Sequence, residues 1–456
     1  MKVKYLGHQG WKVSVGENKV ILDLVGDTMG NGFLTLATSP PRKITQEILD
    51  GVGIFIISHE HADHFDIKFL EKLYSYTPDA TFLISDIASN ALSSLLSCIG
   101  FKVSIFGSYD QISIGDLEIT ALPCLYSRLE PDVYGLLFKD KTTGNAFYTP
   151  IDAIPVRESL DYVRQSVTGV RLDNFTNNFV WRPESQHVLS KCSKENNLED
   201  VVRRFHNFVH MMESNHLVLS GLGWKYDSYE MNESMFHVHH HEITLPQSVD
   251  STLWVASFQD EYELLSGDIE RHIGEEYSLD QRKFSQAVSD QYNYELDHSS
   301  LSRDELTSLL RWVEGTLSMN VSLGCKKLNK AMHYLKMEGK KKSFCLAILD
   351  SGRYYEYSYE FAKSAFTLVE REVTLEQLKE EYVMGLAVNS HIFNGVRLCS
   401  EEAHICFEVA AITWNSRSDL LSEYADVDIA SILHPRYRHQ EYSRHYLSQL
   451  KEANYG

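Results

Sequence analysis

A histidine-rich loop directly after an apolar strand restricts the fold of this chain more than any other segment. Residues 54–57 read Ile-Phe-Ile-Ile, a short apolar run typical of a buried strand. After Ser58, the run His59-Glu60-His61-Ala62-Asp63-His64 places three histidines and two acids within six residues. The alternative is a polar surface loop that happens to be rich in histidine. The direct connection to a buried strand argues against that alternative and favours a site at the strand end.

The spacing within this loop is suited to metal ions. His59 and His61 are two residues apart, so on extended backbone they point the same way and can share one ion. Asp63 and His64 follow at a turn and could serve a second ion. Neutral imidazole suits zinc and iron, and a carboxylate beside it suits a second cation. If Asp63 binds no metal, it is the natural general base for an attacking water.

Short strand patterns dominate the first 150 residues. Apolar or alternating runs bounded by Gly, Asp or Asn predict strands at 3–6, 12–15, 20–24, 53–57, 81–84, 102–106, 116–122, 135–138 and 146–148, with helices at 67–74 and 85–97. Strands that are first paired as meanders and then interleaved with helices favour a layered α/β sandwich.

At the loop the sequence resembles the metallo-β-lactamase-fold superfamily, whose signature is His-x-His-x-Asp-His after a strand. The segment from Tyr5-Leu6-Gly7-His8 to Val20-Ile21-Leu22-Asp23 is similar to the opening hairpin of its lactonase- and phospholipase-like branch. Phe147–Asp152 is similar to the later strand that ends in the metal-bridging aspartate. The resemblance covers residues 1–245. It implies an α/β fold, a four-layer αβ/βα sandwich, with one or two ions of zinc, iron or manganese held by His59, His61, Asp63, His64 and Asp152.

The chain departs from the superfamily pattern between the loop and Asp152. A further ligand histidine is expected there, but no histidine occurs between His64 and His187. Cys124 or Tyr126 could replace it, and a buried structural cysteine is the alternative. The last ligand of the superfamily is a late histidine, for which His237 and His239 are candidates; a solvated strand face is the alternative. His8 and Asp23 are candidates for metal ligands or for groups that orient the ligands.

The remainder of the chain gives softer boundaries. We expect a helical insert at about 155–215, a mainly helical segment at 246–335, and a small α+β domain with a helical tail at 336–456. The order of features is similar, more faintly, to the non-Rieske portion of CMP-N-acetylneuraminate hydroxylase, and the α+β segment is similar to sterol carrier protein. The Rieske pattern of Cys-x-His followed by Cys-x-x-His is absent from the sequence.

The composition of the chain restricts the kinds of partner and the cellular compartment that we expect. The 456 residues include 43 basic and 63 acidic side chains, a net charge of −20, which argues against nucleic acid as the main partner. The seven cysteines contain no Cys-x-x-Cys pair, and no apolar run is long enough for a membrane span. We therefore expect a cytoplasmic protein that acts on a small molecule, with no nucleic-acid partner and no membrane span.

These observations leave three hypotheses. The first is a metal-dependent hydrolase that uses an activated water on an ester, lactone, amide or phosphodiester bond. The second is a di-iron oxygenase or hydroxylase of a small metabolite, served by an external reductase, which the missing histidine favours. The third is a non-enzymatic role on an old scaffold, against which the intact His59–His64 loop argues.

Overall fold

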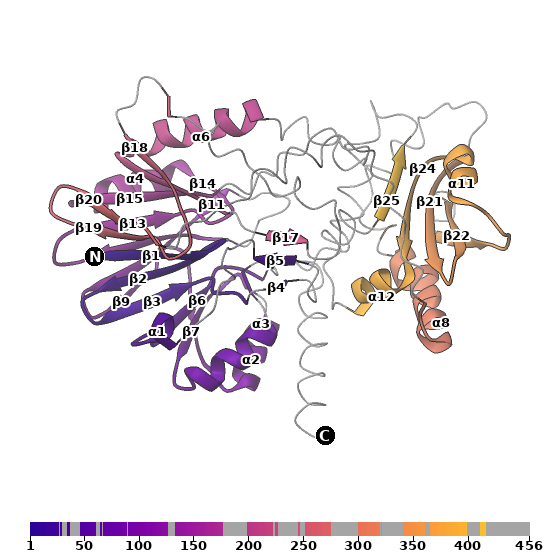
Figure 1. Ribbon diagram of the computed structural model, residues 1–456, viewed down its shortest axis with the longest axis horizontal. Coiled ribbons are helices and arrows are strands. Elements are labelled where there is room, and N and C mark those ends of the chain that lie inside the picture. Colours follow the sequence, from indigo (N-terminus) through magenta and orange to yellow (C-terminus); the bar gives the residue numbers. More distant parts are fainter. Residues whose placement is uncertain are drawn as a thin grey trace. The chain divides into compact units, whose positions relative to one another are not determined.

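The computed structural model describes residues 1–26, 28–29, 34–36, 46–60, 64–65, 67–88, 90–125, 133–176, 198–221, 224–226, 245–246, 251–274, 300–319, 321, 341–360, 365–398 and 411–415. These residues fall into two compact units (Figure 1). The first unit contains the described residues up to 274, and the second contains those from 300 to 415.

The first sheet of the first unit has a meander half and a parallel half. Among the described residues its strand order is β20-β19-β1-β2-β3-β6-β7-β8. The strands are β1 (Lys2–Gly7), β2 (Gly10–Val15), β3 (Asn18–Leu22), β6 (Ile54–Ile57), β7 (Thr81–Ser85), β8 (Lys102–Phe106), β19 (Glu261–Leu264) and β20 (Ile269–His272). Strands β1, β2 and β3 pair antiparallel, whereas β3, β6, β7 and β8 run parallel. Helices α2 (Ile67–Tyr76) and α3 (Asn90–Ile99) connect the parallel strands, as parallel pairing requires.

The second sheet repeats this division. Its described strands have the order β18-β16-β15-β13-β12-β10-β9, of which β18, β16, β15 and β13 are parallel. They are β9 (Gln111–Ile114), β10 (Leu117–Leu122), β12 (Gly135–Asp140), β13 (Ala146–Thr149), β15 (Arg171–Thr176), β16 (His216–Ser220) and β18 (Thr252–Val255). Helices α4 (Arg157–Ser166) and α6 (Leu198–Met212) belong to its parallel half. The smaller elements are α1 (Gln46–Leu49), the pair β11 (Cys124–Leu125) and β14 (Ile154–Pro155), and the group β4 (Thr28–Met29), β5 (Leu34–Leu36) and β17 (Trp224–Tyr226).

Apolar packing arranges the first unit in four layers. One core cluster lies between the sheets and joins Trp11 and Val20 of the first sheet to Phe138 and Phe147 of the second. A second cluster packs α4 and α6 on the outer face of the second sheet. Helices α2 and α3 lie along the outer side of the first sheet (Figure 1). The fold is thus a four-layer αβ/βα sandwich, which confirms the fold class that the resemblance implied.

The strand predictions for the first 150 residues agree with the structure, but two segments further along differ from expectation. In the segment expected to be mainly helical, residues 252–272 form β18, β19 and β20, which belong to the two sheets of the sandwich. The expected boundary at 245 therefore lies too early. The expected helical insert at 155–215 also contains β15, a central strand. The sequence of β15 does not show the apolar pattern of a buried strand, because the buried polar residues Asp173 and Asn174 interrupt it.

The second unit is a smaller sheet with helices. Its described strands have the order β23-β22-β21-β24-β25. They are β21 (Lys341–Asp350), β22 (Arg353–Glu360), β23 (Ala365–Val369), β24 (Tyr382–Asn389) and β25 (Ala411–Asn415). The helices are α8 (Arg303–Trp312), a π-helical turn at Val313–Leu317, α11 (Leu375–Glu381) and α12 (Ser390–Leu398). Ser351 and Gly352 both have positive φ and form a two-residue hairpin turn between β21 and β22. None of the described helices has the length and apolarity to cross a membrane.

Candidate metal centre

The candidate site lies where the carboxyl ends of several strands meet. Asp23 follows β3, and Ser58, His59 and His64 follow β6, all in the first sheet. Asp152 follows β13 in the second sheet. In sheets with parallel strands, polar groups beyond the carboxyl ends converge because the strands share one direction. The two sheets therefore each contribute side chains to one place.

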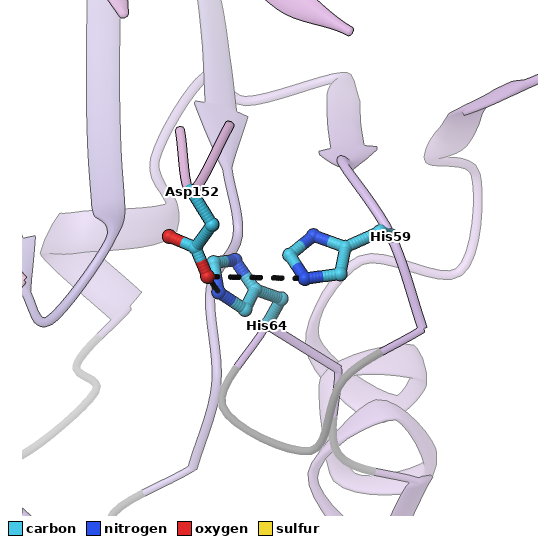
Figure 2. A group of neighbouring side chains, drawn as sticks. All are labelled: His59, His64 and Asp152. Atoms are coloured by element: carbon cyan, nitrogen blue, oxygen red, sulfur yellow. Dashed lines mark hydrogen bonds and ion pairs between the residues drawn. The ribbon is translucent and has the colours of Figure 1, made fainter. Parts of the chain in front are cut away.

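Three of the predicted ligands come together there. His64 Nε2 lies 2.9 Å from Asp152 Oδ2, and His59 Nε2 lies 3.9 Å from the same oxygen (Figure 2). One ligand atom from each of the three residues lies within 4.8 Å of the others. The side chains of His59, His64 and Asp152 are 5, 0 and 4 % exposed. They form a compact, almost fully buried group with both imidazoles directed at one carboxylate oxygen.

A second carboxylate fixes the orientation of His64. Asp23 Oδ2 lies 2.7 Å from His64 Nδ1, on the side of the ring opposite Asp152. Asp23 also accepts from the Ser58 backbone N–H at 2.8 Å and from the Ser58 hydroxyl at 2.6 Å. Because an ionised carboxylate only accepts, Nδ1 of His64 is the protonated nitrogen of this pair. In the neutral imidazole, Nε2 is then left as an acceptor.

Ser58 determines the tautomer of His59 in the same way. Its single hydroxyl proton goes to Asp23, so its oxygen can only accept from His59 Nδ1, which lies 2.9 Å away. His59 therefore also presents Nε2 as an acceptor towards Asp152. Hydrogen bonds from the far nitrogen are the usual way in which proteins orient histidine ligands of metals.

The donor set and its spacing fit a cation. While both imidazoles are neutral, their Nε2 atoms and the carboxylate oxygen are all acceptors, so they repel one another unless positive charge lies between them, from a cation or from a second proton on His64. Two ligand atoms about 2.1 Å from one ion at a tetrahedral angle are about 3.4 Å apart. The separations of 2.9 and 3.9 Å from Asp152 Oδ2 lie on either side of that value. Imidazole and carboxylate donors together suit zinc, iron or manganese.

Three residues around the site have backbone conformations that residues other than glycine seldom adopt. The φ angles are 48° at His8, 45° at Asp23 and 58° at Ile151, directly before Asp152. For a β-branched residue such as Ile151 this conformation is a true outlier, and such residues cost about 1–3 kcal/mol each. The Ile151 side chain is buried in the core between the sheets, which holds the strained turn in place. Among the described residues, Tyr109, Glu213, Gln259 and Ser351 also have positive φ, so three of seven such residues that are not glycine lie around this site.

Other predicted site residues have different positions. His8 lies with its ring 5.7 Å from that of His64, edge to face, and its carbonyl accepts from the Tyr5 hydroxyl and the Gly221 N–H. Asp23 orients His64 and is not part of the three-residue group. The predicted residues His61, Asp63, Tyr126, His237 and His239 lie outside the described residues. Their roles stay predictions.

Cys124 opens the short strand β11. Its Sγ lies 3.8 Å from the Leu122 carbonyl oxygen, and burial raises the pKa of the thiol to about 12. With this raised pKa, Cys124 holds its proton at neutral pH. Metals bind cysteine as the thiolate. Its role as a substitute ligand also stays a prediction.

Two residues of the site were missed by sequence reasoning. Ser58 bridges Asp23 and His59, and its place directly before the first histidine was the available signal. Gln9 donates from Nε2 to Asp152 Oδ1 at 3.3 Å and is 1 % exposed. A single glutamine between His8 and Gly10 carries no recognisable pattern, and only the pairing of the two sheets brings it to Asp152.

Comparison with known proteins gives similarities among solved structures. No protein-family model and no curated protein sequence matches the chain. Isothiocyanate hydrolase from Delia radicum gut bacteria is 14 % identical, with 59 % of this chain and all of that chain covered and a TM-score of 0.41. CmlA, a diiron beta-hydroxylase from Streptomyces venezuelae, is 15 % identical over 58 % of this chain and 54 % of its own, with a TM-score of 0.38. The metallo-beta-lactamase fold protein YhfI from Bacillus subtilis is 14 % identical over 57 and 99 %, with a TM-score of 0.37. The four-layer architecture is assigned from the sheets and helices of this protein and not from these similarities.

Proposed function

We propose that the first unit is a metal-dependent hydrolase of a small molecule, with an ester, lactone, amide or phosphodiester bond as its target. One observation carries the proposal. The Nε2 atoms of His59 and His64 both face Asp152 Oδ2 as acceptors, because Ser58 and Asp23 take the protons on the opposite nitrogens. Three buried acceptor atoms that face one another need a positive charge between them. A bound cation supplies that charge, and the alternative is a second proton on His64.

The surrounding residues support this chemistry. A bound divalent ion supplies a water of lowered pKa and polarises the oxygen of the bond to be cleaved. Asp23 and Ser58 keep both imidazoles in the ligating tautomer, and Asp152 brings negative charge from the second sheet. We propose that His61 and Asp63 complete the ligand set, with Asp63 as the general base for the water if it holds no ion.

Metal content is the first test. We expect the natively purified full chain to contain one or two equivalents of zinc, iron or manganese by elemental analysis. Substitution His64→Ala should remove the metal and turnover together, because it deletes a ligand. The matched control is His272→Ala, at an exposed histidine of β20 (47 % exposed) that forms no part of the site. A His64→Ala protein that keeps both metal and full turnover would contradict the proposal.

Turnover is the second test, on panels of aryl esters, lactones, amides and phosphodiesters. Hydrolysis that depends on added metal and on His59 supports the hydrolase. Iron as the native metal, with oxygen uptake in the presence of a reductant and no hydrolysis, would replace the hydrolase by the di-iron oxygenase and its external reductase. A purified chain without stoichiometric metal would favour the non-enzymatic alternative.

A further inference from the structure

Gln9 connects the two sheets at the candidate site. It lies in the turn between β1 and β2 of the first sheet, and its side chain reaches polar groups beyond the ends of β13, β15 and β16 in the second. Its Nε2 lies 3.3 Å from Asp152 Oδ1, and its Oε1 lies 3.1 Å from Thr176 Oγ1. Burying a polar side chain costs free energy unless its donors and acceptors form hydrogen bonds, and Gln9 forms them with residues of the second sheet.

The hydrogen-bond partners of Gln9 at both ends of its amide form a continuous chain. Asn174 uses its two amide protons on Thr149 Oγ1 at 3.0 Å and Thr176 Oγ1 at 3.3 Å. Thr176 therefore accepts from Asn174 and has its own hydroxyl proton left for Gln9 Oε1. Ser220 is closer to Asn174 Oδ1, at 2.9 Å, than to Gln9 Oε1, at 3.4 Å, and donates to Asn174. Each of these side chains is at most 7 % exposed: Gln9, Thr149, Asn174, Thr176 and Ser220.

This chain of hydrogen bonds has one direction. It runs from Asn174 through the Thr176 hydroxyl to Gln9 Oε1, and then from Gln9 Nε2 to Asp152 Oδ1. A flipped amide would place two oxygens face to face at Asp152, so it is disfavoured at that end. Gln9 therefore presents an N–H to Asp152.

We propose that Gln9 is a positioning residue that determines how Asp152 meets the cation. This inference rests on the proposed metal site. By holding Oδ1, Gln9 reserves Oδ2 for the ion shared with His59 and His64, so Asp152 binds through one oxygen only. The Asn174–Thr176 pair is the rigid support that keeps the amide in this orientation. The role of Gln9 is thus to set the number of ligand atoms around the ion, and not to contact the substrate.

The test compares metal binding by two variants with a matched control. Gln9→Met is similar in volume and removes the hydrogen bonds of the amide, and Thr176→Val removes the hydroxyl that donates to Gln9 Oε1. Gln111→Met makes the same exchange on β9, where the glutamine is exposed and donates to the Tyr162 hydroxyl. The readouts are metal affinity, from competition with a chromophoric chelator, and the visible absorption of the Co²⁺-loaded full chain.

We expect Gln9→Met to weaken metal affinity about 10- to 100-fold, the usual effect of losing a group that orients a ligand. The Co²⁺ absorption should weaken as Asp152 begins to bind through both oxygens and the coordination number rises. Thr176→Val should change both readouts in the same direction by less, and Gln111→Met should resemble the wild type. Urea unfolding checks that each variant is folded; if Gln9→Met does not fold, Thr176→Val alone decides.

The possible failures can be told apart. If the wild type binds metal but Gln9→Met and Thr176→Val retain its affinity and its Co²⁺ spectrum, the role of Gln9 is refuted and the proposed function stands. If the wild type itself binds no Zn²⁺ or Co²⁺, the proposed function is refuted and the inference on Gln9 falls with it.

Discussion

The carboxylate of Asp23 lies 2.7 Å from Nδ1 of His64, and both side chains are fully buried. This pair sets the proton on the far side of the His64 ring and turns Nε2 towards Asp152, 2.9 Å away. Asp23 itself is held by two hydrogen bonds from Ser58. The buried carboxylate thus controls the chemistry of a histidine 41 positions later in the chain.

Substitution Asp23→Asn tests this relationship. Asn tolerates the positive φ of 45° at this position, so the backbone is kept while the anion is lost. An amide has one acceptor oxygen in place of two, so the NH2 group faces either the Ser58 backbone N–H or the pair of Ser58 hydroxyl and His64 Nδ1, and the contacts on that side are lost. We expect metal affinity to fall about 10- to 100-fold, measured by chelator competition. Asp79→Asn, at an exposed turn, is the control and should leave affinity unchanged. Equal affinities in the two variants would show that Asp23 does not orient the ligand.

Ser58→Ala should affect His59 more than His64. The variant removes the oxygen that accepts from His59 Nδ1 and one of three donors to Asp23. His59 is then free to change tautomer, whereas His64 keeps its contact with Asp23. We expect several-fold weaker metal binding and a new chemical shift for the His59 ring in ¹⁵N NMR. Ser75→Ala, on the exposed side of α2, serves as the control. An unchanged His59 signal would contradict the assigned tautomer.

His216 should make stability sensitive to acid. It opens β16 and stacks on Trp254, with ring centroids 5.8 Å apart. Burial lowers the pKa of His216 below its usual 6.5, although the charges of Asp268 and Asp173 oppose this shift. The unfolded chain therefore binds the proton more tightly, so this contribution to stability is complete above pH 6.5 and is lost as the pH falls below it.

Substitution His216→Phe keeps the stacking on Trp254 but cannot be protonated. We expect the variant to lose less stability than the wild type between pH 7 and 5, by at most about 1.4 kcal/mol per pH unit, in urea unfolding. His272→Phe, at an exposed position, should follow the wild-type slope. Parallel slopes for the wild type and His216→Phe would refute the lowered pKa.

The second unit contains a buried ion pair whose loss should be costly. Glu356 is fully buried and accepts from Arg371 Nε at 2.6 Å and Nη2 at 3.0 Å, and from the Tyr382 hydroxyl at 2.5 Å. Arg371, which is one-third exposed, also binds Glu381. Arg371→Met would leave the Glu356 carboxylate buried without its cation, which we expect to cost about 3 kcal/mol of unfolding free energy.

Lys379→Met provides the comparison for this prediction. Its pair with Glu376 is largely exposed, so its loss should cost less than about 1 kcal/mol. The double variant Glu356→Gln with Arg371→Met should recover part of the stability, because no fully buried charge is left unpaired; Glu381, which also loses Arg371, is about one-third exposed. Urea unfolding of the full chain measures all three. An Arg371→Met protein as stable as Lys379→Met would show that Glu356 tolerates burial without Arg371.

Several features of this protein are determined by local sequence. The nine strands predicted in the first 150 residues follow from apolar periodicity bounded by turn residues and are present in the structure, which adds β4, β5, β9 and β11. The run Ile54–Ile57 followed by His59 and His64 predicts both a strand and candidate ligands at its end. Strands β18, β19 and β20 were not predicted because they are short and gain their stability from sheet partners far away in the chain, such as β19 from β1.

The geometry of the site, in contrast, depends on tertiary structure. Asp152 reaches His64 only because two sheets, formed by separate parts of the chain, pack face to face with their strand ends together. Ser58 and Gln9 carry no motif, and Asp23 was a candidate without an assigned partner; the contacts of all three form across 35, 41 and 143 positions of sequence. Local sequence determines which residue types stand at the strand ends, because periodicity and turn chemistry act over a few residues. The protonation and orientation of those residues are set by the buried partners that only the folded core places beside them.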